Sequence, residues 1–181
     1  MAETVTLPVR GRRRIQVLTV LTLAGSATAA ATGLLAGLLL GPLPDPSTAV
    51  VAVVVAASGL GDLARVHPLD VGRQVPLEWG RWFSATTTAL LYGARLGVGP
   101  LTVLTSWTWW AGLLLAGLHG PLVAVIATVV FHLVRVAVMV LGVAGSSRSG
   151  PRRAALIARL DRPVTVLASA ATLAVAGAVL A

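Results

Sequence analysis

Charged and titratable side chains inside long apolar stretches are the residues of this sequence that could carry chemistry. Arg95 stands twelve residues beyond Phe83, where an apolar stretch over 83–118 begins. A helical rise of about 1.5 Å per residue places its guanidinium about 18 Å into a bilayer, near the midplane. A charge at that depth costs at least about 2.5 kcal/mol and usually faces a bundle interior or a cavity. Arg95 is therefore the first candidate for a solute-binding residue.

Three polar side chains near Arg95 in the sequence complete the predicted substrate-binding set: Tyr92, Thr102 and Ser106. Pro100 is expected to interrupt the helix between them, because proline removes a main-chain hydrogen bond and clashes with the preceding turn. A broken helix beside an intramembrane cation is how many transporters build an anion site at the midplane. The alternative is that Arg95 only binds the freed carbonyls and holds the kink.

Another set of polar residues lies in two other apolar stretches. His132 and Arg135 are three residues apart within 121–143, so they share one face of a helix. His132 could relay a proton, because an imidazole titrates near neutral pH; a hydrogen bond to a neighbouring helix is the alternative. Asp62, near the inner end of 47–64, is the predicted ion-pair partner of Arg135. Such a pair would neutralise both charges without a functional role.

Several kinds of chemistry are excluded or disfavoured. The chain has no cysteine, which excludes disulfides, thiolate metal sites and cysteine nucleophiles. It shows no paired histidine–glutamate metal spacing, no glycine-rich phosphate loop and no serine elbow. The histidines His67, His119 and His132 fall at different predicted depths, and haem held by His132 alone is disfavoured. We expect neither an enzyme nor a bound metal or cofactor.

The composition is that of a membrane protein. Hydrophobic residues make up 56% of the chain and charged residues 11%, whereas a soluble domain carries about 25% charge. All 14 basic residues are arginine, and they cluster beside the apolar stretches. This favours contact with anionic lipid headgroups over nucleic acid. The lack of lysine, with abundant alanine, valine and glycine, indicates a GC-rich bacterial genome.

Five apolar stretches are long enough to cross a hydrocarbon core, which takes about 20 helical residues. They cover 15–41, 47–64, 83–118, 121–143 and 163–181. The predicted fold is an all-α polytopic membrane protein, with one domain over 1–181. The third stretch would form a helix of about 54 Å, so we expect it to be broken or re-entrant, or to cross twice.

The positions of the arginines indicate whether the stretch 83–118 crosses the membrane once or twice. They precede the first stretch and occupy the connectors 65–82 and 144–162, whereas 42–46 and 119–120 hold none. Since basic connectors stay in the cytoplasm, an even number of crossings separates the two basic connectors. One broken crossing plus the next helix satisfies this condition. We expect five crossings of the cell membrane, with the N-terminus in the cytoplasm and the C-terminus outside.

The first stretch imitates a signal peptide, with arginines at 10–14, an apolar run and small residues near 29–31. Its apolar run is nearly twice the usual length of such a segment, about 7–15 residues. We therefore expect a retained helix, with cleavage as the alternative.

Small residues recur at every fourth position of this stretch: Gly25, Ala29, Gly33, Gly37 and Gly41. On a helix they form one face that a neighbouring main chain can approach closely. This face either packs within the chain or forms a seam with a membrane partner subunit or a second copy of the chain.

The segment 91–110 reads LYGARLGVGPLTVLTSWTWW, and RQVPLEWGRW stands upstream of it. This segment resembles the broken helices of the cytochrome-c-biogenesis/thiol-reductant transmembrane family. It is also loosely similar to the methylamine-utilisation membrane proteins. The resemblance covers about residues 73–143 and implies a related helical membrane fold. The family relays electrons through paired cysteines beside the proline, and this chain has none. No catalytic residue is transferred.

Two functions are consistent with the sequence. The first is a small transporter- or permease-like protein for an anionic or polar solute, with Arg95 beside the broken helix. The alternative is a non-catalytic membrane anchor or assembly subunit of a larger complex, docked through the glycine face or the connector 65–82.

Overall fold

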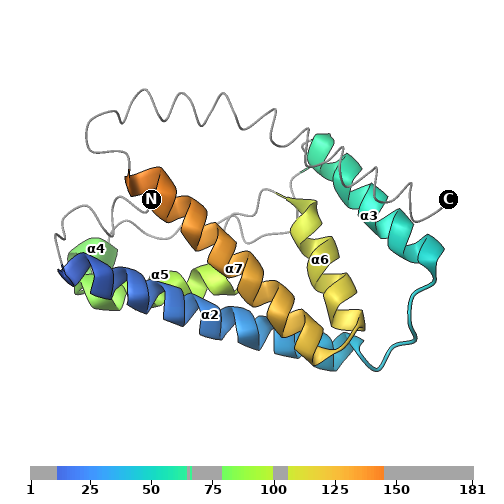
Figure 1. Ribbon diagram of the computed structural model, residues 1–181, viewed down its shortest axis with the longest axis horizontal. Coiled ribbons are helices and arrows are strands. Elements are labelled where there is room, and N and C mark those ends of the chain that lie inside the picture. The colour runs from blue at the N-terminus through green and yellow to red at the C-terminus, as the bar shows by residue number, and fades with distance from the viewer. Residues whose placement is uncertain (1–11, 65, 67–78, 100–105, 145–181) are drawn as a thin grey trace.

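The computed structural model describes residues 12–64, 66, 79–99 and 106–144, apart from some side chains near the end of the last range. These residues form helices and no strand: α2 (Arg12–Leu40), α3 (Thr48–Leu63), α4 (Trp79–Trp82), α5 (Ala85–Gly97), α6 (Trp107–Leu118) and α7 (Pro121–Ala144) (Figure 1). The all-α fold class is therefore confirmed for this part of the chain. The predicted stretch 163–181 lies outside the described residues.

Serine residues mark where three of the helices begin. Ser47, Ser84 and Ser106 have extended backbones, and their hydroxyls accept main-chain N–H groups from the first turns of α3, α5 and α6. Serine is a preferred residue at this position because it satisfies an N–H that has no partner within the helix.

The third apolar stretch is divided between α5 and α6. Helix α5 ends at Gly97, and Gly99 then adopts a φ of +68°, a conformation that glycine enters without a steric penalty. The chain thus leaves the helix immediately before Pro100, the expected point of interruption. Pro100 itself lies outside the described residues.

Helix α2 is the centre of the assembly. Its buried residues recur at every fourth position: Val17, Leu21, Gly25, Ala29, Gly33 and Gly37. This face packs against α5 and α7 along its length and against α6 near its end. The glycine face is therefore used within the chain, and its small residues bring neighbouring main chains into direct contact.

Helix α5 runs parallel to α2, and α6 ends against the end of α2. A Cβ at Gly93 of α5 would meet the main chain of Leu21, whereas a Cβ at Gly117 of α6 would meet Ala36 and Leu40. Helix α5 thus lies beside the first part of α2, whereas α6 approaches at a steep angle and meets the end of α2 (Figure 1).

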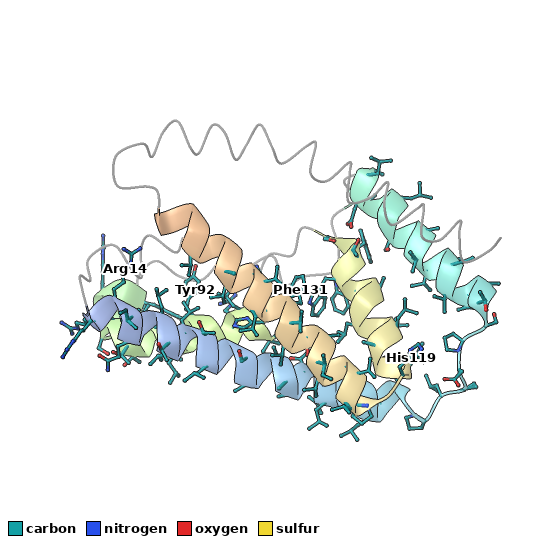
Figure 2. The ribbon with its side chains drawn as sticks, viewed as in Figure 1. Arg14, Tyr92, His119 and Phe131 are labelled. Atoms are coloured by element: carbon teal, nitrogen blue, oxygen red, sulfur yellow. The ribbon has the colours of Figure 1, made fainter. Side chains whose placement is uncertain are left out.

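Helix α7 runs the opposite way along the same central helix. Its first residue, Pro121, lies against Gly37, and His132 lies against Gly25. Figure 2 shows His119, just before α7, and Arg14 at opposite ends of α2. Helix α3 packs on α6. The described chain is therefore a bundle built on α2.

The outer surface of this bundle is aliphatic. Large apolar side chains such as Leu39, Val53, Leu122 and Ile126 are more than half exposed. Helix α2 is long and apolar enough to cross a membrane, and α3, α6 and the first 17 residues of α7 are shorter apolar helices. Polar side chains, by contrast, are found inside: Ser58, Asp62, Thr88, Thr128 and His132 are buried.

Candidate functional site

Two of the predicted binding residues lie one turn apart on α5. Tyr92 is 7% exposed, and its hydroxyl has no hydrogen-bond partner among the described residues. Arg95 is partly buried in the last turn of α5. Beside it, the Thr28 hydroxyl of α2 donates to the Ala94 carbonyl over 2.8 Å. This bond fixes α5 against α2 at the level of Arg95.

His132 occupies the point where α2, α5 and α7 meet. Its side chain is 2% exposed, and neither ring nitrogen has a hydrogen-bond partner in the described part of the chain. A Cβ built on Gly25 would lie 2.1 Å from the ring Cε1 and 2.9 Å from the Gly93 carbonyl oxygen. The Thr22 main chain also lies near the ring, outside hydrogen-bond geometry. The hydrogen bond to a neighbouring helix that the sequence allowed would be made with this main chain of α2, and it stays a prediction.

Arg135 connects the histidine and the tyrosine. It follows His132 by three residues on α7, is partly buried, and lies near enough for its charge to act on both His132 and Tyr92. The charge of Arg95 also acts on Tyr92. We call Tyr92, Arg95, His132 and Arg135 the polar cluster. It has two cationic side chains around two buried polar groups.

Asp62 and Ser106 form a separate site between α3 and α6. The Asp62 carboxylate accepts the Ser106 hydroxyl over 2.8 Å and the Thr108 hydroxyl over 2.7 Å. It also accepts the main-chain N–H groups of Trp107 and Thr108. Asp62 thus fastens the end of α3 to the beginning of α6.

The structure gives Asp62 partners other than the predicted Arg135, so the ion pair between these two residues stays a prediction. Asp62 is engaged by the hydroxyl and N–H groups at the start of α6, whereas Arg135 belongs to the polar cluster on α7. The physical reason is the helix break, because it leaves N–H groups at the start of α6 that a carboxylate can satisfy. The sequence contained a signal for this: Ser106 and Thr108 follow Pro100, and Asp62 is the acidic residue of the preceding apolar stretch.

The predicted substrate-binding set is therefore divided. Tyr92 and Arg95 belong to the polar cluster, together with His132 and Arg135, which were assigned other roles. The Ser106 hydroxyl is bound to Asp62. Thr102 lies outside the described residues.

A cavity of about 200 Å³ lies between α6 and α7. Its lining includes Ser106 just before α6, Thr108, Trp109 and Gly112 of α6, and Thr128 and Phe131 of α7. The ring centroids of Trp109 and Phe131 are 6.2 Å apart, and Figure 2 shows Phe131 between the two helices. Sequence reasoning did not find this cavity, because its walls come from helices whose facing sides were unknown.

Among the described residues, no three His, Cys, Asp or Glu side chains come together in a way that could hold a metal ion. Comparisons with protein-family models, curated proteins and solved structures find no match to this chain. The site is therefore interpreted from its own geometry.

Proposed function

We propose that the chain is a polytopic membrane protein with a permease-like function, passing a small anionic or polar solute through the polar cluster. The observation that carries the proposal is a pair of buried groups beside two arginines, the Tyr92 hydroxyl and the His132 ring, which have no hydrogen-bond partner among the described residues. We propose a cell-membrane location with five crossings, of which α5 and α6 together make the third. The N-terminus would be cytoplasmic and the C-terminus outside.

The distribution of side chains supports the membrane part of this proposal. Outward-facing leucines and valines would be covered by lipid, which removes the aggregation hazard that such a surface has in water. Inward-facing glycine, alanine and threonine residues are typical of contacts between helices in membranes. At about 1.5 Å per residue, α2 is about 43 Å long, which exceeds the hydrocarbon thickness of about 30 Å. The arginines Arg12, Arg13 and Arg14 at its start would lie among anionic headgroups.

The buried polar groups of the polar cluster support the proposal that a solute binds there. A buried polar group without a partner costs about 1–3 kcal/mol, and a bilayer offers no water to relieve that cost. Ionisable residues inside membranes usually line solute or proton pathways. A solute bearing hydrogen-bonding oxygens and a negative charge would satisfy both Tyr92 and His132 and would be attracted by Arg95 and Arg135.

Anion flux into proteoliposomes tests this function. Nitrate and inorganic phosphate serve as probes, and osmotic swelling reports their entry. Arg95→Gln and Tyr92→Phe should each reduce the rate at least about tenfold, which corresponds to losing one good hydrogen bond to a charged group. Arg81→Gln, at an exposed position of α4, is the matched control and should leave the rate unchanged. Swelling no faster than in protein-free liposomes, or equal rates for Arg95→Gln and the natural chain, would refute the proposal.

The alternative role, a membrane anchor or assembly subunit, is favoured by one observation. Helix α3 packs on α6 and leaves Val50, Val53 and Leu60 more than half exposed. A stoichiometric partner copurifying in mild detergent, and lost when Val53→Ser is introduced, would support this role. A monodisperse single chain that conducts anions would exclude it as the main function.

A further inference from the structure

The cavity between α6 and α7 has polar groups at one end and aromatic walls. Its polar end is formed by the hydroxyls of Ser106 and Thr108, and its walls include Trp109 and Phe131. The Thr128 hydroxyl is turned away, because it donates to the Ala124 carbonyl of its own helix over 2.9 Å and faces Gly33 of α2. Ser106 and Thr108 therefore supply the hydroxyls that a ligand in this cavity would meet.

Both of these hydroxyls already use their protons in hydrogen bonds to Asp62. Ser106 Oγ and Thr108 Oγ1 each donate to Asp62 Oδ2, over 2.8 Å and 2.7 Å. A hydroxyl has one proton and two lone pairs. With the protons facing Asp62, the oxygens can offer only lone pairs to a ligand: two on Thr108 and one on Ser106, whose other lone pair accepts the Thr108 N–H over 3.1 Å. This end of the cavity is therefore a hydrogen-bond acceptor.

The charges beside this end of the cavity also favour a positively charged ligand. The Asp62 carboxylate lies directly behind the two hydroxyls and contributes one negative charge. The beginning of α6 contributes about half a positive charge in the opposite sense, so Asp62 and the start of α6 together contribute about half a negative charge beside the cavity. Trp109 and Phe131 line the same cavity, and aromatic rings add a further attraction because they bind ammonium groups.

From these properties we infer that the cavity binds a small organic cation, a primary alkylammonium whose N–H groups reach Ser106 and Thr108 and whose alkyl body lies between Trp109 and Phe131. A cavity of about 150 Å³ accommodates benzene, so this one has room for a short alkyl chain. This site is separate from the polar cluster and does not depend on the proposed anion flux.

Three matched probes test the inference on the full chain in detergent, by isothermal titration and saturation-transfer NMR. Propylammonium has the charge and the donors, 1-propanol has one donor without charge, and propionate has neither donor nor positive charge. Propylammonium should bind at least about tenfold more tightly than 1-propanol, and propionate should not bind. Equal binding of propylammonium and 1-propanol, or no binding of propylammonium, would overturn the inference.

Variants then locate the site. Gly112 lines the cavity, and a Cβ added there meets nothing within 4 Å, so Gly112→Leu should fill the cavity without disturbing the fold. Propylammonium binding should weaken at least about tenfold in Gly112→Leu and about fivefold in Phe131→Leu, which loses a cation–π contact. Ile126→Val, at an exposed position outside the cavity, should bind normally. Unchanged binding in Gly112→Leu would place the ligand elsewhere and refute the site.

Discussion

The imidazole of His132 lies where a side chain on Gly25 would have to be. A Cβ added at Gly25 would come within 2.2 Å of the ring Nε2, so the absence of a side chain on α2 makes room for the ring on α7. The position of one residue thus depends on the type of the other. A fully buried ring is thereby held at the junction of three helices, and its nitrogens have no hydrogen-bond partner in the part of the chain that the structure describes.

Replacing His132 with leucine should separate stability from function. The unpartnered ring nitrogens cost about 1–3 kcal/mol, and leucine has a similar bulk without polar atoms. The free energy of unfolding in detergent should therefore stay equal or rise by about 1 kcal/mol, while anion uptake is lost. Exposed His119→Leu is the control and should keep uptake. A loss of stability above about 2 kcal/mol in His132→Leu would show that the ring makes a structural hydrogen bond.

Adding one methyl group at Gly93 should weaken the bundle. A Cβ there would lie 2.1 Å from the Leu21 carbonyl oxygen and 2.9 Å from its carbon, so α5 and α2 would have to separate. Overpacking of this kind costs about 1–3 kcal/mol or more. Gly112→Ala is the matched control, because its Cβ meets nothing and alanine favours a helix by up to about 1 kcal/mol. Thermal unfolding should give opposite signs for the two variants; equal effects would contradict the packing described for Gly93.

A double-mutant cycle distinguishes the observed contacts of Asp62 from the ion pair that the sequence indicated. Asp62→Ala and Thr108→Val should show a coupling energy of about 0.5–3 kcal/mol, because the carboxylate binds both the hydroxyl and the N–H of Thr108. Asp62→Ala and Arg135→Gln should be additive within about 0.5 kcal/mol. The opposite pattern in chemical unfolding would restore the ion pair.

The bond between α2 and α5 can be tested through two threonines of α2. The Thr28 hydroxyl reaches the Ala94 carbonyl of α5 over 2.8 Å, whereas the Thr32 hydroxyl donates to Thr28 within its own helix. Hydrogen bonds between membrane helices contribute about 0.6 kcal/mol on average and up to about 1.7. Thr28→Val should therefore destabilise more than Thr32→Val by about this amount. Equal unfolding midpoints would show that the bond between the helices contributes nothing.

Much of this fold could be predicted from the sequence, because helix length and small-residue spacing are local properties. The four-residue repeat in α2 indicated a closely packed face, and Pro100 indicated the interruption between α5 and α6. The residue types of Asp62, Ser106 and Thr108 were a signal for their contacts, but the sequence did not show that α6 lies beside α3 after the interruption. The same holds for the polar cluster: Tyr92 and His132 are 40 positions apart in the sequence, and only packing against Gly25 brings their helices together.

The central place of α2 has a consequence for biosynthesis. This helix leaves the ribosome before α5, α6 and α7, yet its glycine face packs against all three. That face must therefore wait for its partners while about a hundred further residues are synthesised, at about 5–20 residues per second. Assembly of this helical bundle is a delayed event, completed only when the last of these partners has emerged.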